Sequence, residues 1–116
     1  MGIQVKRVYD APATSDGYRV LIDRLWPRGV TKDRAHLDEW ARELAPSTEL
    51  RRWFGHDPSR FEEFRRRYTK ELAAHADKLS ELRSRARRGT LTVVYSARDT
   101  QHNDAVVIAE ILRRPS

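Results

Sequence analysis

The chain has 116 residues, carries a formal net charge of +6 at pH 7 and contains no cysteine. This length is typical of one domain with a single hydrophobic core, so residues 1–116 are expected to form one domain. The lack of cysteine excludes disulfides, thiolate nucleophiles and cysteine-ligated zinc.

The sequence also argues against a membrane protein or a secreted one. No run of residues approaches the roughly 18 apolar residues that a membrane helix needs. Residues 1–6 lack a basic stretch followed by an apolar run, so they do not resemble a secretory signal. We therefore expect a cytoplasmic protein with no membrane partner.

The first quarter of the chain predicts two strands joined by a polar loop. Residues 3–8 alternate apolar and polar side chains, which is typical of a strand. Residues 10–17 are rich in Pro, Ser, Asp and Gly, so they are expected to form a loop. Residues 18–25 have a continuous apolar centre and predict a buried strand that ends near Asp23. A Trp-Pro-Arg-Gly segment then breaks the strand.

The next segments are short. Residues 31–36 predict one helical turn. Residues 37–44 fit the apolar stripe of a helix, but the segment is also short enough to be a strand. Ser47 is a suitable N-cap for a helix that continues through Phe54.

The second half of the chain predicts helices around one more strand. Asp57 as N-cap, with Pro58 at the first helical position, predicts a helix to about residue 74. A second helical stretch ends at Gly89. Residues 91–95 form a short β-branched run that predicts a central strand, and residues 103–114 predict a final helix. This order of elements predicts an α/β domain in which helices cover a mostly parallel sheet of about four strands.

Two polar loops follow the two best strand candidates. They cover residues 23–29 and residues 95–103. Ligands of open α/β sheets bind beyond the carboxyl ends of the strands, so neighbouring parallel strands would bring both loops to one edge. Arg24 and Arg28 could then bind a phosphate or carboxylate through their planar guanidinium groups. The alternative is that Arg24–Asp99 or Arg28–Asp23 ion pairs only stabilise the loops.

Other chemistry has weaker signals. His56 could act as a general acid or base, or it could be a loop histidine beside a helix cap. His102, Asp99 and Asp104 match no standard metal-ligand spacing, so no metal is expected. The glycines form no phosphate-binding loop or dinucleotide fingerprint, so no cofactor is expected.

A basic helix offers a second kind of surface. Glu62 and Glu63 lie four residues before Arg66 and Arg67, so that stretch is charge-balanced. The arginines with fewer acidic neighbours, on which a nucleic-acid track would depend, are Arg83, Arg85, Arg87 and Arg88. Arginines near a helix C-terminus are also favoured by the helix dipole alone, so nucleic acid is not the preferred partner.

Several of these motifs occur together in a known family. Residues 20–29 read Val-Leu-Ile-Asp-Arg-Leu-Trp-Pro-Arg-Gly, and further matches follow at Lys32, Trp40, residues 44–47, residues 54–58, Tyr95, Asp99 and Asn103. The chain resembles the YeaO-like family, a domain of unknown function in bacteria and archaea. The resemblance implies a small three-layer α/β fold in which the segment around Trp40 is a strand. It brings no established activity.

The resemblance also implies that the polar motif positions form a site, because hallmark residues in loops point to function more than to packing. We expect a pocket for a small phosphate-like or nucleotide-like anion at the carboxyl ends of the strands. Its ligand-binding residues would be Asp23, Arg24, Arg28, Lys32, Tyr95 and Asn103, while His56 and Asp99 would supply proton transfer or orientation. The alternatives are a nucleic-acid-binding module on the Arg83–Arg88 surface and a protein-interaction domain with an exposed Trp26 or Trp53 as anchor.

Overall fold

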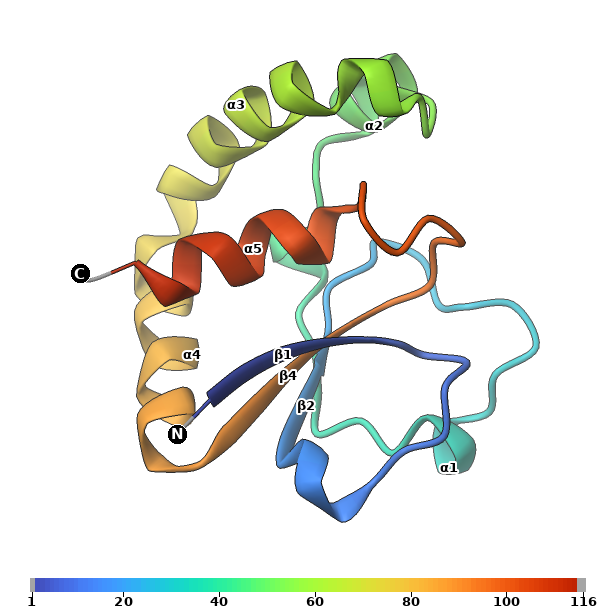
Figure 1. The fold of residues 1–116 in the computed structure, drawn as a ribbon, viewed down its shortest axis with the longest axis vertical. Helices are drawn as coiled ribbons and strands as arrows, with labels where there is room; N and C mark the ends of the chain where they lie inside the picture. The colour runs from blue at the N-terminus through green and yellow to red at the C-terminus, as the bar shows by residue number, and fades with distance from the viewer. Residues whose placement is uncertain (1, 115–116) are drawn as a thin grey trace.

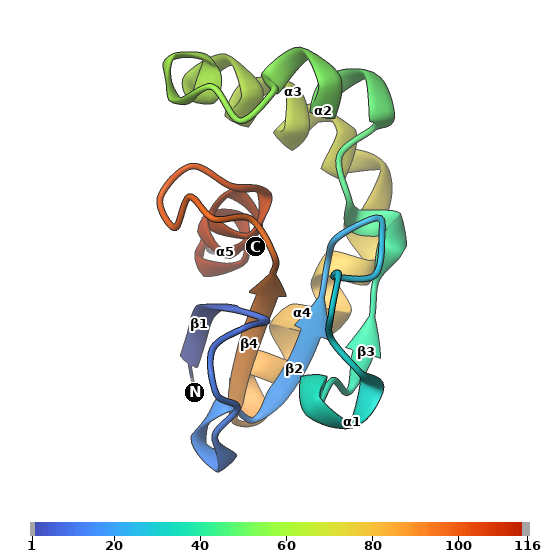
Figure 2. The ribbon, with the colours of Figure 1, turned by 90° about the vertical axis from the view of Figure 1, so that its right-hand side faces the viewer.

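The sheet of this domain has four parallel strands in the order β1-β4-β2-β3, as seen in a computed structural model that describes residues 2–114 (Figures 1 and 2). The strands are β1 (Gly2–Arg7), β2 (Tyr18–Leu21), β3 (Glu39–Trp40) and β4 (Thr90–Tyr95). The helices are α1 (Lys32–Ala35), α2 (Thr48–Phe54), α3 (Phe61–Leu72), α4 (Ala76–Arg88) and α5 (Asp104–Arg113). The predicted α/β class with a parallel four-stranded sheet is confirmed.

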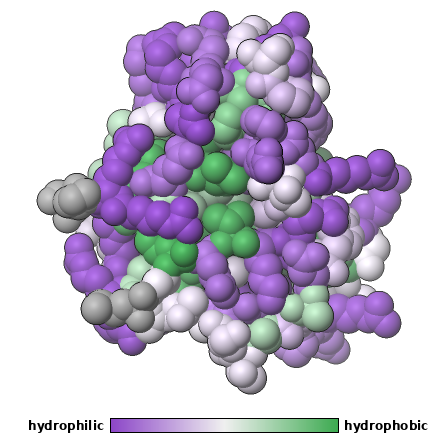
Figure 3. All heavy atoms as spheres, viewed as in Figure 1, coloured by the Kyte–Doolittle hydropathy of each residue, from purple (hydrophilic) through white to green (hydrophobic). Residues whose placement is uncertain are grey.

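One face of the sheet carries the main core. Alternate strand residues point to it, among them Val20 of β2 and Leu91 and Val93 of β4, all fully buried. They pack against apolar side chains of α3, α4 and α5, such as Phe64 and Leu82. Figure 3 shows that apolar side chains gather near the centre of the visible face, which is otherwise mostly hydrophilic. The long helices α3, α4 and α5 therefore form one layer over this face of the sheet.

The opposite face is covered more thinly, by α1 and the loops around it. A small apolar cluster there joins Leu21 and Val94 to Ala35 of α1, with Trp26 and Trp40 packed against it. The two indole rings meet edge to face, with centroids 5.4 Å apart. This third layer consists mainly of loop, so it leaves room for polar groups beside the strands.

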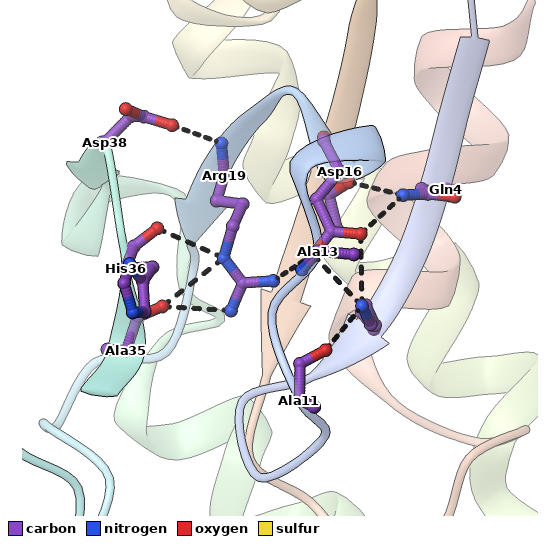
Figure 4. A network of polar contacts seen from close by, with 10 residues as sticks. Gln4, Ala11, Ala13, Asp16, Arg19, Ala35, His36 and Asp38 are labelled. Carbon is purple, nitrogen blue, oxygen red and sulfur yellow. Dashed lines mark hydrogen bonds and ion pairs between the residues drawn. The ribbon is translucent and has the colours of Figure 1, made fainter.

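A buried ionic network occupies the rest of that second face (Figure 4). Asp16 is only 2% exposed and Arg19 only 3%. The Asp16 carboxylate accepts hydrogen bonds from Arg19 (2.6 Å), Lys6 (3.0 Å), Gln4 (3.1 Å) and the backbone N–H of Ala13 (3.0 Å). Each oxygen therefore has a donor, which a carboxylate buried in this way requires. The network joins the loop after β1 to β1 and β2.

Several predicted boundaries need correction. The strand predicted over residues 18–25 ends at Leu21, although the N–H of Ile22 still donates to Val94 O. The segment 37–44 is partly strand, at Glu39–Trp40, and partly a 3-10 turn, at Arg42–Leu44. The helix predicted from Pro58 begins with a 3-10 turn, since Pro58–Arg60 precede α3.

The two helix caps predicted from the sequence, Ser47 and Asp57, are present, and Asn103, which was expected inside the last helix, caps it. The side chains of Ser47 and Asn103 accept hydrogen bonds from the backbone N–H groups of Leu50 and Val106, and thus cap α2 and α5. Asp57 accepts from the N–H of Ser59 at the start of the turn before α3. No helix within residues 2–114 is long and apolar enough to cross a membrane.

Candidate functional site

The loops that follow β2 and β4 lie at the same edge of the sheet. The two strands are parallel neighbours, with Leu21 opposite Val94 in the register. The hydroxyl of Ser96, directly after β4, donates to Oδ2 of Asp23, two residues after β2, over 2.5 Å. The shared edge expected from the sequence is therefore found.

A pocket of about 350 Å³ opens at this edge. Its walls come from the loops after β2 and β4, from α2 with the turn that follows it, and from the start of α5. Five of the eight expected site residues line it, and these are Asp23, Arg24, Arg28, His56 and Asn103. The structure thus brings the greater part of the expected site together.

Three arginines line the pocket, and all three are exposed. They are Arg24, Arg28 and Arg51. Within residues 2–114 none of them forms an ion pair, so the Arg24–Asp99 and Arg28–Asp23 pairs considered above are not present. The one protein acceptor for these guanidinium groups in that part of the chain is Pro46 O, 3.1 Å from Arg24 Nη2. The arginines therefore keep most of their donors free for a ligand.

The loop that carries Arg24 and Arg28 is held by three side-chain donors. The indole N–H of Trp40 bonds to Asp23 O at 2.7 Å, and that of Trp26 to Val30 O at 2.6 Å. The hydroxyl of Tyr9, which also lines the pocket, bonds to Arg28 O at 2.9 Å. These bonds fix the backbone while they leave the guanidinium groups at the mouth of the pocket.

Two carboxyl groups line the inner part of the pocket. Burial raises the pKa of Asp23 above its usual value, although hydrogen bonds from Ser96 oppose the increase. Burial also raises the pKa of Asp104 to about 8, and the nearby charge of Asp23 adds to this increase. Since two neighbouring, partly buried carboxyl groups resist double ionisation, the pair retains a proton near neutral pH.

The histidines of the pocket are oriented in two ways. His56 follows Gly55, and both have a positive φ, of 57° and 54°, where α2 ends. This conformation turns the chain so that His56 lines the pocket. His102 is oriented by Asp99, whose carboxylate lies 2.9 Å from its Nδ1.

Asp99 therefore acts on the pocket only through His102. Its carboxylate also accepts the N–H of Gln101 at 2.9 Å, and this bond, with help from His102, holds the pKa of Asp99 below its usual value. Asp99 is not among the lining residues, so its expected role in proton transfer or orientation stays a prediction, and its contact with His102 fits orientation.

Lys32 and Tyr95 also lie outside the pocket lining. Lys32 is exposed on α1, on the thinly covered side of the sheet. Tyr95 is 3% exposed and belongs to the main core, where burial raises its pKa. Both positions match the family pattern, and Tyr95 at least has a packing role.

Helix α2 is fixed relative to α3 by one acidic residue. Glu71 of α3 accepts the backbone N–H of Ser47 at 2.8 Å and its hydroxyl at 2.6 Å. Ser47 in turn caps α2. Through this contact α3 positions the helix that carries Arg51 and Phe54 into the pocket wall.

The arginines of α4 are not all free, as a nucleic-acid track on this helix would require. The guanidinium of Arg83 donates to Ile111 O of α5 at 3.1 Å, and its Nε is buried without a partner in residues 2–114. Arg85 stacks on the ring of Tyr18 at 4.2 Å. Arg87 and Arg88 remain exposed, and Arg88 bonds to Ser84. The four arginines therefore do not form one free track.

Two further expectations need correction. Trp26 and Trp53 are only partly exposed, and Arg60 and Arg67 stack on the Trp53 ring. Among residues 2–114, the large apolar side chains that are exposed are Leu25 (65%) and Tyr9 (48%). On α3, Glu62 pairs with Arg65 rather than Arg66, at a spacing of three residues.

Among the polar residues of the pocket, Tyr9, Arg51, Ser96 and Asp104 were not expected from the sequence. Ser96 and Asp104 had a usable signal, because each stands at the end of a strand or the start of a helix on the ligand-binding side of the sheet. Arg51 had none, since its place depends on how α2 packs. Within residues 2–114 no group of three or more His, Asp or Glu residues could hold a metal ion.

Comparison with known proteins assigns the family but no activity. Residues 2–115 match the family described as the inactive DUF488-N3 subclade. The chain is 49% identical over 113 residues to the uncharacterized protein YeaO of Escherichia coli K12, covering 97% of this chain and 98% of YeaO. It is 43% identical over 110 residues to the uncharacterized protein Rv3073c of Mycobacterium tuberculosis, covering 95% and 92%. No solved structure matches. The chain therefore belongs to the inactive DUF488-N3 subclade, a YeaO-like domain of unknown function.

Proposed function

We propose that the pocket at the carboxyl ends of β2 and β4 binds a small anionic ligand of the phosphate or nucleotide type. The observation that carries this proposal is the set of three arginines, Arg24, Arg28 and Arg51, which line one pocket without an ionic partner in residues 2–114. Unpaired guanidinium groups around a concave site favour phosphate, which they bind through two parallel hydrogen bonds.

The surroundings support an anion in two further ways. His56 and His102 line the same pocket and can donate to the ligand, and Asp99 orients His102. Asn103 and Asp104, at the start of α5, also line the pocket, where the positive end of the helix dipole lowers the cost of nearby negative charge.

A binding role fits the family better than a catalytic one. The matching family is described as inactive, and the pocket holds no cysteine or metal cluster in residues 2–114. The serine of the pocket donates to the carboxyl group of Asp23 and not to a histidine. The histidines are therefore assigned to ligand binding.

Nucleic-acid binding through α4 remains the main rival. It has less support because Arg83 donates to the backbone of α5 and Arg85 stacks on Tyr18. A pocket of about 350 Å³ suits a single small ligand better than a polymer.

The test is a thermal-unfolding titration with inorganic phosphate, nucleotides and short oligonucleotides. The variants are Arg28→Ala, Arg51→Ala and an Arg85/Arg87/Arg88→Ala triple variant. Arg52→Ala is the matched control, because Arg52 is exposed beside Arg51 on α2 but is not part of the pocket. A ligand at 100 times its Kd stabilises the folded state by about 2.7 kcal/mol, a shift of several degrees.

The expected result is stabilisation by phosphate or a nucleotide that Arg28→Ala and Arg51→Ala reduce and that Arg52→Ala and the triple variant retain. Equal stabilisation of Arg28→Ala and the unsubstituted chain would contradict the pocket. Stabilisation by oligonucleotides alone, lost in the triple variant, would assign function to α4 instead.

A further inference from the structure

We infer that the ligand of this pocket is a phosphorylated sugar, free or within a nucleotide, whose hydroxyl groups bind Asp23 and Asp104 while its phosphate binds the arginines. This inference rests on the proposed function and adds the chemistry of the uncharged part of the ligand. It follows from the different groups found at the mouth of the pocket and in its inner part.

The pocket is polarised from its mouth to its inner wall. Arg24, Arg28 and Arg51 are exposed at the mouth. Asp23 and Asp104 are only partly exposed, and Asn103, which caps α5 between the loop and Asp104, is buried. A ligand whose phosphate binds the arginines at the mouth therefore places its uncharged end against the two carboxyl groups.

The carboxyl groups of Asp23 and Asp104 can accept more hydrogen bonds than the protein donates to them. Oδ1 of Asp104 accepts the N–H of Ala105 at 2.9 Å, and its Oδ2 has no hydrogen bond with residues 2–114. Asp23 accepts the hydroxyl of Ser96 at 2.5 Å. Neither carboxyl forms an ion pair in that part of the chain. These oxygens are accessible from the pocket, so they can accept hydrogen bonds from a ligand.

The charge of this inner region selects hydroxyl groups over charged ones. The pair retains a proton near neutral pH, so it offers one donor together with several acceptors. A hydroxyl both donates and accepts, and it suits such a pair. A second phosphate would be repelled by the remaining carboxylate, and an ammonium group would have to pass three arginines. Carboxylates binding the hydroxyls of a ribose are a known solution in nucleotide sites.

The walls between the two ends are apolar and suit a ring. Phe54 and Phe64, whose rings stack with centroids 4.4 Å apart, line the pocket together with Pro27, Pro46 and Ala97. Such walls pack against the C–H faces of a sugar or the flat face of a base. The volume of about 350 Å³ is at the lower end of ligand pockets, which fits one sugar phosphate or one nucleoside monophosphate.

The experiment compares four ligands by calorimetric titration of the full chain. They are inorganic phosphate, ribose 5-phosphate, 2-deoxyribose 5-phosphate and adenosine monophosphate. We expect ribose 5-phosphate to bind at least about tenfold more tightly than phosphate, which is the effect of one hydrogen bond to a charged group. The 2-deoxy sugar should lose part of this gain. If adenosine monophosphate binds more tightly than ribose 5-phosphate, the ligand is a nucleotide. If the two bind equally, the ligand is a free sugar phosphate.

Two variants locate the effect. In Asp104→Ala, ribose 5-phosphate and phosphate should bind within about threefold of each other. Glu110→Ala is the matched control, since Glu110 lies on the same helix and pairs with Arg65 outside the pocket. If Asp104→Ala does not fold, the comparison of ribose with 2-deoxyribose 5-phosphate still decides, because it needs no variant.

The two proposals fail in different ways. If phosphate binds through Arg28 but the sugar adds nothing, or if the gain survives in Asp104→Ala, the sugar inference is overturned and the anion pocket stands. If phosphate does not bind, or binds Arg28→Ala as well as the unsubstituted chain, the proposed function itself is overturned.

Discussion

The hydroxyl of Ser96 bonds to the carboxylate of Asp23 over 2.5 Å, so the first residues beyond two neighbouring strands hold each other in place. Ser96 follows β4 and Asp23 follows β2, and these strands are parallel. The contact fixes one wall of a pocket that Asp104 also lines, and the charge of Asp23 adds to the increase in the pKa of Asp104. The protonation of that carboxyl pair should therefore be visible in the stability of the protein.

The first prediction concerns the pH dependence of stability. Burial raises the pKa of Asp104 to about 8, whereas an aspartate in an unfolded chain has a pKa of about 3.9. Between these values the folded state holds a proton that the unfolded chain has lost. The free energy of unfolding should therefore fall as pH rises from about 4 to about 8. Asp104→Asn cannot ionise, so its stability should decline less over this range.

The measurement is thermal unfolding from pH 4 to pH 9. At pH 4 Asp104→Asn should resemble the unsubstituted chain, and at pH 9 it should melt about 3 °C or more higher. Glu43→Gln, at an exposed residue outside the pocket, should follow the unsubstituted curve. Parallel pH profiles for Asp104→Asn and the unsubstituted chain would refute the shared proton.

The second prediction concerns the buried Asp16–Arg19 pair. Burial alone would raise the pKa of Asp16, but hydrogen bonds from Ala13, Lys6 and Arg19 lower it below its usual value overall. A lowered pKa stabilises the fold above about pH 4, and this contribution is lost as pH falls through the folded pKa. Asp16→Asn should cost about 3–5 kcal/mol at pH 7, because it leaves a buried guanidinium without its counter-charge.

Urea denaturation at pH 7 and pH 3 checks this prediction. The cost of Asp16→Asn should be smaller at pH 3. Asp10→Asn, at an exposed residue of the same loop region, should stay within about 0.5 kcal/mol of the unsubstituted chain. A cost at Asp16 no greater than that of Asp10→Asn would mean that the ion pair does not stabilise the fold.

Local signals made most of the fold predictable. The caps Ser47, Asp57 and Asn103 bond to nearby backbone N–H groups, and such bonds depend on residues two or three positions away. Segment 37–44 could not be resolved in the same way. Its two strand residues exist only because Glu39 and Trp40 pair with β2, and this partner is distant in sequence.

Most of the expected residues that line the pocket follow strand ends, and His56, in the turn after α2, is the exception. Arg24 and Arg28 belong to a polar loop after a strand, and the loop's position places them at the pocket. Arg51 enters the pocket because Glu71, twenty-four residues from Ser47, fixes the helix that carries Arg51. Asp99 and Tyr95 share the family pattern but serve His102 and the core. Whether a motif residue contacts a ligand depends on its side-chain direction, which the sequence does not report.

The third prediction tests a close backbone approach at Gly17. Its φ is +62°, and a Cβ built there would lie 2.2 Å from the backbone oxygen of Thr90. Gly29 also has a positive φ, of +77°, but open space around it. Gly29→Ala should therefore cost only the strain of a left-handed alanine, about 1–2 kcal/mol. Gly17→Ala should cost clearly more, since β4 would have to move.

Urea denaturation of the two alanine variants distinguishes backbone strain at a positive φ from a steric clash between the new Cβ and the Thr90 oxygen. A cost for Gly17→Ala of about 3 kcal/mol or more, or failure to fold while Gly29→Ala folds, is the expected result. Equal costs would show that the loop before β2 can move away from β4.

The last prediction separates stability from binding at His56. A histidine with a φ of 57° is strained, and glycine adopts this conformation freely. His56→Gly should therefore leave the free energy of unfolding unchanged or raise it by up to about 1 kcal/mol, while phosphate binding weakens about tenfold because a donor is lost.

His36→Gly is the matched control, since His36 has a φ of 47° but lies outside this pocket. Urea denaturation and phosphate titration of both variants provide the measurement. His36→Gly should match His56→Gly in stability and the unsubstituted chain in affinity. Unchanged phosphate affinity in His56→Gly would remove His56 from the site, and the arginines would then bind the anion without it.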